Sequence, residues 1–330
     1  MGKYYVTGGT QRKNAKEGIE WFSYGEASIF IFDDVDGSVA KCVSYMTPDE
    51  IRPEEKNANV VFKAGSLDGH RLVVCTQTEI LTYSLPDFKQ VGYTTHPWLN
   101  DVHHVMVKGG GNYLIANTGL DMVLELTPAG EVVGEYSVLP GEDIWARFDK
   151  EVDYRKVFTT KPHHAHPNYV FEINGEIWVS RFVQKDVICL TNPNKVIDIG
   201  IEKVHDGNIH DGKVYFTAVD GHVVIADPVT CEVLAVHDLN AMTDTNKTLG
   251  WCRGLHILDD DRILVGFSRL RQSKFRENVQ WVKFQIRQRE SAGKLPTRVA
   301  LYDLAAERLV WDINLEKYEC NAVFSILPAD

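Results

Sequence analysis

The sequence predicts an all-β fold: a six-bladed β-propeller with four-stranded blades. A short apolar strand preceded by a tight turn recurs five times, at 71–74, 113–116, 176–179, 213–216 and 262–265. Gly, Asn and Asp dominate the turns and supply the positive φ angles of hairpins. Each strand precedes two more strand-like runs, without a convincing helical period anywhere. A repeated four-strand unit is typical of propeller blades.

The two chain ends together supply the sixth blade. Five complete units run from about residue 59 to 315. One strand is left at the C-terminus, over 321–326, and three at the N-terminus, over 4–6, 27–32 and 39–43. Joining them closes the ring and removes open sheet edges. We therefore treat residues 1–330 as a single domain; an open pair of β-sandwiches is the alternative fold.

Composition narrows the function classes. The chain is 44% apolar and 25% charged, as in ordinary globular proteins, and no apolar run reaches the roughly 18 residues that span a bilayer. The N-terminus lacks an apolar signal stretch, and the six cysteines are scattered without a CxxC pair. A net charge of −11 argues against nucleic-acid binding. We expect a cytoplasmic protein with a small-molecule substrate and neither nucleic-acid nor membrane partners.

The long segments identify one face of the propeller as functional. Links between blades and links from the second to the third strand of a blade lie on the same face. The long segments 8–26, 45–58, 137–162 and 267–297 are all links of these two kinds. Long ordered loops are usually kept for function. We expect lid-like insertions at about 137–162 and 267–297.

The second insertion is also strongly basic. Residues 269–298 carry nine Lys or Arg against two Glu, interleaved with aromatic and aliphatic residues. This contrast with the acidic remainder of the chain has three interpretations. The segment is a solvated surface excursion, a partly helical lid over an anionic substrate, or a contact that makes a homo-oligomer.

Histidines gather where the first strand of a blade begins. Eight of the twelve lie at or just before such strands. First strands line the central channel, and their N-terminal ends open on the face of the long loops. Converging imidazoles are common ligands for divalent metals. We predict an iron, zinc or manganese site, with calcium as a further option, whose ligands come from His104, His164, His166, His210 and His256.

Other residues would support this site. Asp101 and Asp206 are placed to accept hydrogen bonds from the second ring nitrogens of metal ligands. Arg181 and Arg253 would orient an anionic substrate. Without a metal, the histidines would instead act as general acid, general base or nucleophile. A non-catalytic binding scaffold, in which the histidines only satisfy buried backbone groups, is the third hypothesis.

One short motif carries a family resemblance. His166-x-Asn168 is followed by the strand that ends Val179-Ser180-Arg181. This arrangement resembles bacterial arylsulfotransferases of the six-bladed type, which move a sulfuryl group through a histidine. The resemblance implies that His166, Asn168 and Arg181 would cradle the sulfate oxygens, with His104 and His210 as looser counterparts of the other channel histidines.

The general pattern is also similar to the lactonase and NHL-repeat propellers. In that group a calcium or zinc ion lies at the channel mouth on Asn, Asp and Glu, and Asn168, Asn208 and Asn321 fit that arrangement. The function predicted first is a metal-dependent lyase, hydrolase or oxygenase for a small anionic or hydroxylated molecule. Its predicted catalytic residues are His166, Asn168, Arg181 and Arg253.

Overall fold

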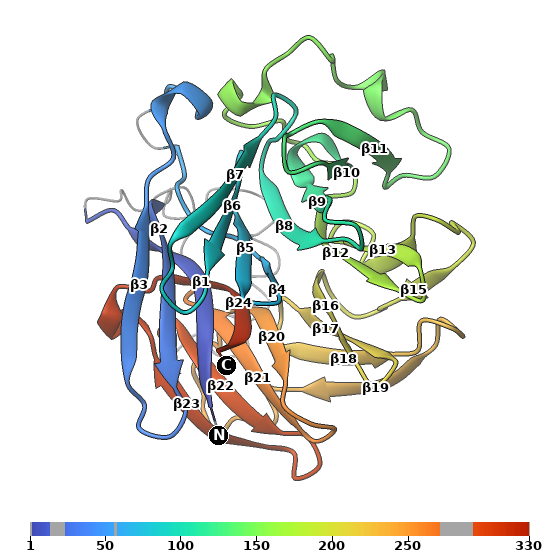
Figure 1. Cartoon of the computed structure of the whole chain (residues 1–330). Coiled ribbons are helices and arrows are strands. Elements are labelled where there is room, and N and C mark those ends of the chain that lie inside the picture. The colour runs from blue at the N-terminus through green and yellow to red at the C-terminus, as the bar shows by residue number, and fades with distance from the viewer. Residues whose placement is uncertain (1, 14–23, 56–57, 271–292, 330) are drawn as a thin grey trace.

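The computed structural model describes residues 2–13, 24–55, 58–270 and 293–329. Six four-stranded antiparallel sheets surround a central axis in a ring (Figure 1). Helical turns in the described ranges are short, such as the 3₁₀ turns η2 (Asp49–Ile51), η4 (Ile144–Ala146) and η5 (Tyr154–Lys156). The predicted six-bladed propeller is confirmed, and the open-sandwich alternative is excluded.

The first three blades follow the chain closely. Blade 1 consists of β24 (Ala322–Ala329), β1 (Lys3–Gln11), β2 (Tyr24–Asp33) and β3 (Val39–Tyr45). Blade 2 consists of β4 (Ser66–Asp68), β5 (Arg71–Cys75), β6 (Glu79–Ser84) and β7 (Gln90–Thr95). Blade 3 consists of β8 (Val102–Val107), β9 (Tyr113–Asn117), β10 (Met122–Leu126) and β11 (Val132–Ser137).

The other three blades repeat this order from the axis outward. Blade 4 consists of β12 (Pro167–Ile173), β13 (Glu176–Arg181), β14 (Asp186–Cys189) and β15 (Val196–Asp198). Blade 5 consists of β16 (Val204–His210), β17 (Lys213–Ala218), β18 (His222–Ala226) and β19 (Val233–Asp238). Blade 6 consists of β20 (Trp251–Ile257), β21 (Arg262–Ser268), β22 (Arg298–Asp303) and β23 (Arg308–Asn314).

Blade 1 closes the ring as predicted, by pairing the two ends of the chain. β1 lies between β2 and β24, with Val6 opposite Ile326, and the two termini lie near each other (Figure 1). A Cβ added to Gly8 would lie 1.9 Å from the carbonyl oxygen of Ala322. Glycine therefore permits the close approach of β1 and β24. β1 also runs on to Gln11 and β2 begins at Tyr24, so the segment 8–26 is shorter as a loop than expected.

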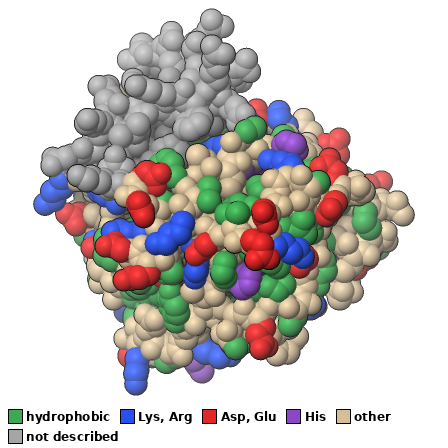
Figure 2. Space-filling view, turned by 90° about the horizontal axis from the view of Figure 1, so that it is seen from above, with side chains coloured by type: hydrophobic (Ala, Val, Ile, Leu, Met, Phe, Trp, Pro, Cys, Tyr) green, Lys and Arg blue, Asp and Glu red, His purple; other side chains and the backbone are tan. Residues whose placement is uncertain are grey.

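The hydrophobic core lies between neighbouring blades. Trp178 of blade 4 and Phe216 of blade 5 are fully buried in one such interface, with Phe171 beside them. The outermost strands alternate exposed and partly buried positions, as in β19 and β23. In the view of Figure 2, acidic, basic and apolar side chains intermingle over the described surface. No single charged patch stands out among the described residues on this face.

The long links gather on one face, as expected from their place in the blades. One pocket is lined by residues 53 and 58–59 between blades 1 and 2, by 77–78 in the β5–β6 turn, and by 100–101 and 157–163 between later blades. Most of the predicted insertion 267–297 lies outside the described residues, which leave out 271–292. In the part of the chain that is described, no helix has the length and apolar character to cross a membrane.

Candidate functional site

The innermost strands of several blades carry a β-bulge near the axis. The register of β8 with β9 skips His103, and that of β12 with β13 skips Asn168. The pairing of β20 with β21 likewise skips Arg253 and Gly254. A bulge inserts an unpaired residue and re-aims its side chain. Bulges at equivalent places in several blades bring together residues that are distant in sequence.

His103 has an acceptor oxygen on each side of its ring. Its Nδ1 lies 2.8 Å from Asn168 Oδ1, and its Nε2 lies 3.4 Å from Asp101 Oδ1. Asn168 Nδ2 donates to the Val204 carbonyl at 2.9 Å, which fixes the amide so that its oxygen faces the imidazole. His103 Nδ1 must then carry the proton and donate it to Asn168. In the neutral ring, Nε2 carries the lone pair and makes no hydrogen bond to Asp101; a proton taken up at Nε2 would be stabilised by that carboxylate.

Asp101 connects His103 to a buried cation. Lys63 Nζ donates to Asp101 Oδ1, and the Lys63 side chain is only 5% exposed. Burial alone would raise the pKa of Asp101, but Lys63 and then His103 hold it well below its ordinary value. Burial lowers the pKa of Lys63 despite the carboxylate. The ion pair thus places a carboxylate and an ammonium beside the base.

His163 and His166 form a second oriented pair. Their Nδ1 atoms are 2.9 Å apart, and His163 Nε2 lies 3.3 Å from Thr160 Oγ1. The Thr160 hydroxyl donates its proton to the Gly119 carbonyl, so it accepts from His163 Nε2. In neutral His163 the Nδ1 atom must then accept from His166 Nδ1, which leaves the lone pair of His166 on Nε2. The hydrogen bonds therefore determine the tautomer of each ring.

The two histidine groups touch. The ring centroids of His103 and His166 are 4.8 Å apart and nearly perpendicular. Burial, followed by Lys63, lowers the pKa of His103 to about 4. Burial also lowers the pKa of His163, and lowers that of His166 well below its ordinary value, with His103 adding to the effect. Near neutral pH the cluster therefore presents uncharged imidazoles, the form that accepts protons.

A buried carboxylate fixes the turn that carries the pair. Asp121 Oδ1 accepts from the amides of Ala165 and His166 at 3.0 and 2.7 Å. Its Oδ2 accepts from the amide of His164 and from Arg147 Nη1, both at 2.7 Å. His166 itself has φ 58°, a left-handed conformation that is uncommon outside glycine. Asp121 thereby holds a strained turn that presents His166.

Blades 5 and 6 contribute a second carboxylate and a guanidinium. Asp206 accepts from the Gly254 amide at 3.0 Å and from the Thr217 hydroxyl at 2.5 Å. Burial raises the pKa of Asp206 to about 6. The Arg253 guanidinium lies 3.7 Å from the centroid of the Phe324 ring, and Arg253 Nε donates to a carbonyl of β24 at 3.1 Å. Arg253 therefore places a cation on the innermost strand of blade 6, and its role in orienting a substrate stays a prediction.

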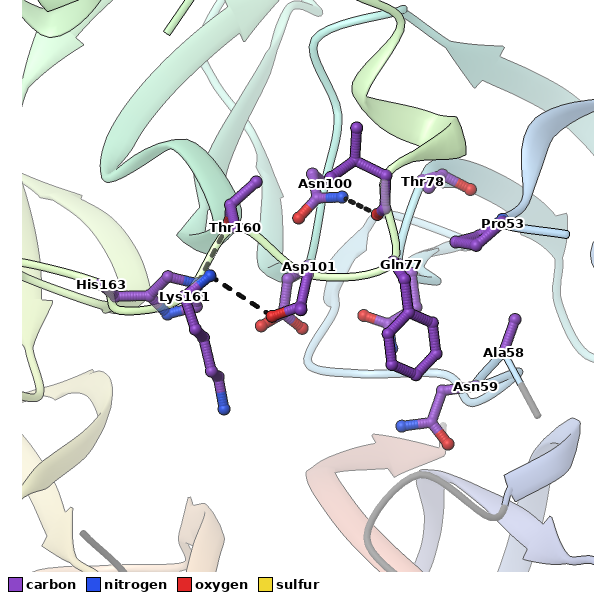
Figure 3. Close-up of a pocket in the computed structure, with 13 residues that line it drawn as sticks. Pro53, Ala58, Asn59, Gln77, Thr78, Asn100, Asp101, Thr160, Lys161 and His163 are labelled. Carbon is purple, nitrogen blue, oxygen red and sulfur yellow. Dashed lines mark hydrogen bonds between the residues drawn. The ribbon is translucent and has the colours of Figure 1, made fainter. Parts of the chain in front are cut away.

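A pocket opens beside the histidine cluster, on the face of the long loops. Its empty volume is about 510 Å³, including space open to solvent, and Asp101 and His163 are part of its lining (Figure 3). Thr160 of the same wall holds His163, as described above. A bound molecule that occupied this pocket would therefore lie against the cluster.

The five histidines predicted as metal ligands do not come together. His104 is buried and stacked on Tyr169, with the two ring centroids 3.6 Å apart, and His164 is exposed. His210 and His256 lie at the C-terminal ends of β16 and β20. His210 is near Asp260, and His256 lies against Tyr4. Over the described ranges, no group of three or more His, Cys, Asp or Glu side chains could hold a metal ion. Only His166 of the predicted set belongs to the cluster.

The arrangement follows from the geometry of strands. Adjacent residues of a strand point to opposite sides, so His103 reaches the axis and His104 turns into the space between blades. Strands β16 and β20 run from one face of the propeller toward the other. Asp206 and Arg253 lie near their beginnings, and His210 and His256 lie near their ends. Residues at the start and the end of one inner strand therefore cannot share a site.

Arg181 has a different place from the one predicted. It makes a two-point contact with Asp186, at 2.8 Å from Nε to Oδ1 and 2.5 Å from Nη2 to Oδ2. Its Nη1 donates to the Val138 carbonyl at 2.9 Å. These partners tie blade 4 to the link that leaves blade 3. Of the predicted support, Asp101 contacts the cluster, whereas Asp206 holds the bulge of blade 6.

Sequence reasoning missed Lys63, His103, His163 and Asp121 as site residues. His103 and His163 are among the eight histidines at or before inner strands, but their orientation depends on the bulge and on the turn. Two left-handed residues, Asp101 (φ 48°) and His166, each stand two positions before a bulged residue. The resulting spacing, Asp101-x-His103 and His166-x-Asn168, is a signal in the sequence that could have found them.

Comparison with known proteins supports the fold and indicates no function. No model of a known family matches the chain, and no curated protein matches it. A protein of unknown function from Bacteroides caccae superposes with a TM-score of 0.63 and 14% identity, over 100% of this chain and 99% of that one. The WD40 propeller domain of Doa1 gives a TM-score of 0.49 and 11% identity, over 94% of this chain and 79% of that one.

The fold therefore places the chain among the six-bladed β-propellers. Similarity at these identities describes architecture and does not transfer an activity. The arylsulfotransferase resemblance is not among what the comparisons show. Any function must accordingly be argued from the side chains at the axis.

Proposed function

We propose that this chain is an enzyme that acts on a small molecule at the channel mouth through histidine acid–base chemistry that needs no metal ion. The observation that carries the proposal is the oriented base His103, whose Nδ1 proton is committed to Asn168 and whose Nε2 can take up a proton that the Asp101 carboxylate, 3.4 Å away, would stabilise. A base whose second nitrogen is held by a fixed acceptor is the usual arrangement of catalytic histidines.

The second pair extends the chemistry. His166 donates from Nδ1 to His163, so its Nε2 is the atom available to take a proton or to attack an electrophilic centre. The ring that takes a proton from the substrate in the first half of a reaction can return it to the leaving group as an acid in the second half. The first step requires a neutral ring, in agreement with the lowered pKa values.

Two cations suit a substrate that carries or develops negative charge. Lys63 lies beside Asp101, and Arg253 belongs to β20, the innermost strand of blade 6. A cation held in a partly buried site stabilises charge more strongly than one in water, because less solvent screens it. The proposed substrate is therefore a small molecule with an anionic or acidifiable group.

The first test measures the rings themselves. Nitrogen-15 NMR of histidine-labelled protein at pH 7 should show His103 neutral with the proton on Nδ1, and His166 likewise. The His103→Asn and His166→Asn variants assign the signals. Doubly protonated rings at pH 7 would remove the proposed bases.

The second test measures turnover. A panel of 4-nitrophenyl sulfate, phosphate, acetate and glycosides is assayed with a chelator present, alongside elemental analysis of the purified protein. We expect turnover of at least one ester, lowered about 100-fold or more by His103→Asn or His166→Asn and unchanged by His70→Asn, a control at an exposed turn. Turnover that needs a stoichiometric metal, or that survives both variants, would contradict the proposal.

A further inference from the structure

The pocket beside the cluster differs in chemistry from the cluster itself. Amide and hydroxyl side chains dominate its wall, and Asp101 and Lys161 are its two charged residues. Phe158, whose ring is 39% exposed, supplies a flat apolar surface, together with Pro53. The pocket therefore offers hydrogen-bonding groups around an apolar face.

Several polar groups of this wall are fixed in place. Asn59 Oδ1 accepts from the Tyr24 amide at 3.1 Å, and Figure 3 shows the Asn59 amide nitrogen turned toward the centre of the view. Thr78 Oγ1 donates to the Ile51 carbonyl at 2.9 Å, so this hydroxyl keeps its acceptor capacity. These groups are a donor and an acceptor, held by neighbouring backbone.

Gln77 adds a buried hydrogen-bond acceptor that lacks a donor. Its Oε1 is closed off from solvent and has no hydrogen-bond partner among the described residues. An unsatisfied buried acceptor costs free energy, and such groups in native structures call for an explanation. Because Gln77 is part of the pocket lining, a ligand could supply the missing partner if the amide turned toward the pocket. A ligand hydroxyl can both donate to the oxygen and accept from the nitrogen.

We infer that this pocket binds a sugar or another cyclic polyol, as the non-reacting part of the substrate. A sugar ring has hydroxyl groups around its edge and C–H bonds on its faces, which match the amides and the Phe158 ring respectively. This inference rests on the proposed function, because Asp101 and His163 line both the pocket and the cluster and so place the reacting group of such a substrate against the histidines.

The experiment measures binding without turnover. Saturation-transfer NMR is recorded on the full chain with methyl glycosides of glucose, galactose and mannose, and with inositol and glycerol. We expect transfer from at least one cyclic compound, and affinity about tenfold weaker in Phe158→Ala and about fivefold weaker in Gln77→Met. Tyr318→Ala is the matched control, because Tyr318 is 40% exposed and does not line the pocket.

Each outcome of these measurements supports or overturns the inference or the proposed function. Absence of transfer from every compound, or transfer that is unchanged in both pocket variants, overturns the inference. Gln77→Met nearly keeps the side-chain volume and so decides the matter where Phe158→Ala fails to fold. Sugar binding by the wild type, together with no turnover of any compound of the panel by the wild type, would retain the inference and reject the proposed function. Turnover that is indifferent to both pocket variants would reject the inference alone.

Discussion

Asp121→Asn tests whether one buried carboxylate holds the turn that presents His163 and His166. Asp121 accepts three consecutive backbone amides and one guanidinium hydrogen, and its side chain is only 4% exposed. Asparagine keeps the shape and tolerates the left-handed φ of 49° at this position, so the backbone is not disturbed. The substitution therefore changes charge and hydrogen bonding alone.

The magnitude follows from the contacts. The asparagine oxygen can keep the amides of Ala165 and His166, but its NH₂ group then faces the His164 amide and Arg147, which are both donors. Breaking a buried ion pair by removing one partner costs about 3–5 kcal/mol. We expect the free energy of unfolding to fall by about that amount, or the turn to open locally at a similar cost.

Two matched variants separate the contributions. Arg147→Met removes the ion pair, together with the hydrogen bond from Arg147 Nη2 to the Pro162 carbonyl, and leaves all three amides on the carboxylate. Because the Arg147 side chain is 26% exposed, we expect a loss of about 1–2 kcal/mol. Asp186→Asn breaks the buried pair with Arg181 instead, so it lowers stability without reaching the histidine cluster.

Urea unfolding gives the global cost, and amide hydrogen exchange at residues 164–166 gives the local one. Asp121→Asn should accelerate exchange at these amides and alter the ring signals of His163 and His166, whereas Asp186→Asn should leave both unchanged. A loss below about 0.5 kcal/mol, within the range of ordinary surface substitutions, with unchanged exchange would refute the reasoning.

Three further predictions concern protonation and ring closure. Burial lowers the pKa of His104 to about 3, so its contribution to stability is present above pH 6.5 and is lost as pH falls; the stability of the wild type relative to His104→Phe should therefore fall by about 2 kcal/mol between pH 7 and 5, and a difference independent of pH would contradict this. Burial raises the pKa of Asp206 to about 6, so carbon-13 NMR should show one aspartate carboxyl that titrates near pH 6 and is missing in Asp206→Asn; that carboxyl contributes stability below its ordinary pKa and loses it as pH rises through 6. Gly8→Ala should cost about 3 kcal/mol in urea unfolding, since its Cβ would meet a β24 carbonyl at 1.9 Å, whereas Gly109→Ala, with nothing within 4 Å, should be neutral.

The sequence by itself determined the architecture. Strand runs such as 71–74 and 262–265, and the turns before them, are local signals, and their repetition counted the blades correctly. The leftover strands at the two ends then required closure through β1 and β24, which the structure confirms. The sequence also indicated the face of the long links and the region in which histidines gather, because both follow from position within a blade.

Tertiary structure alone decided which histidines share a site. A bulge shifts the alternation of side chains by one residue, so His103 rather than His104 reaches the axis, and no periodic pattern announces that shift. Distance along the axis separates His210 and His256 from His166, although all belong to innermost strands or their starts. Lys63 and Asp121 entered the site through contacts between blades. Such contacts depend on how the blades pack together. They join residues that lie far apart in the chain, so no local sequence pattern indicates them.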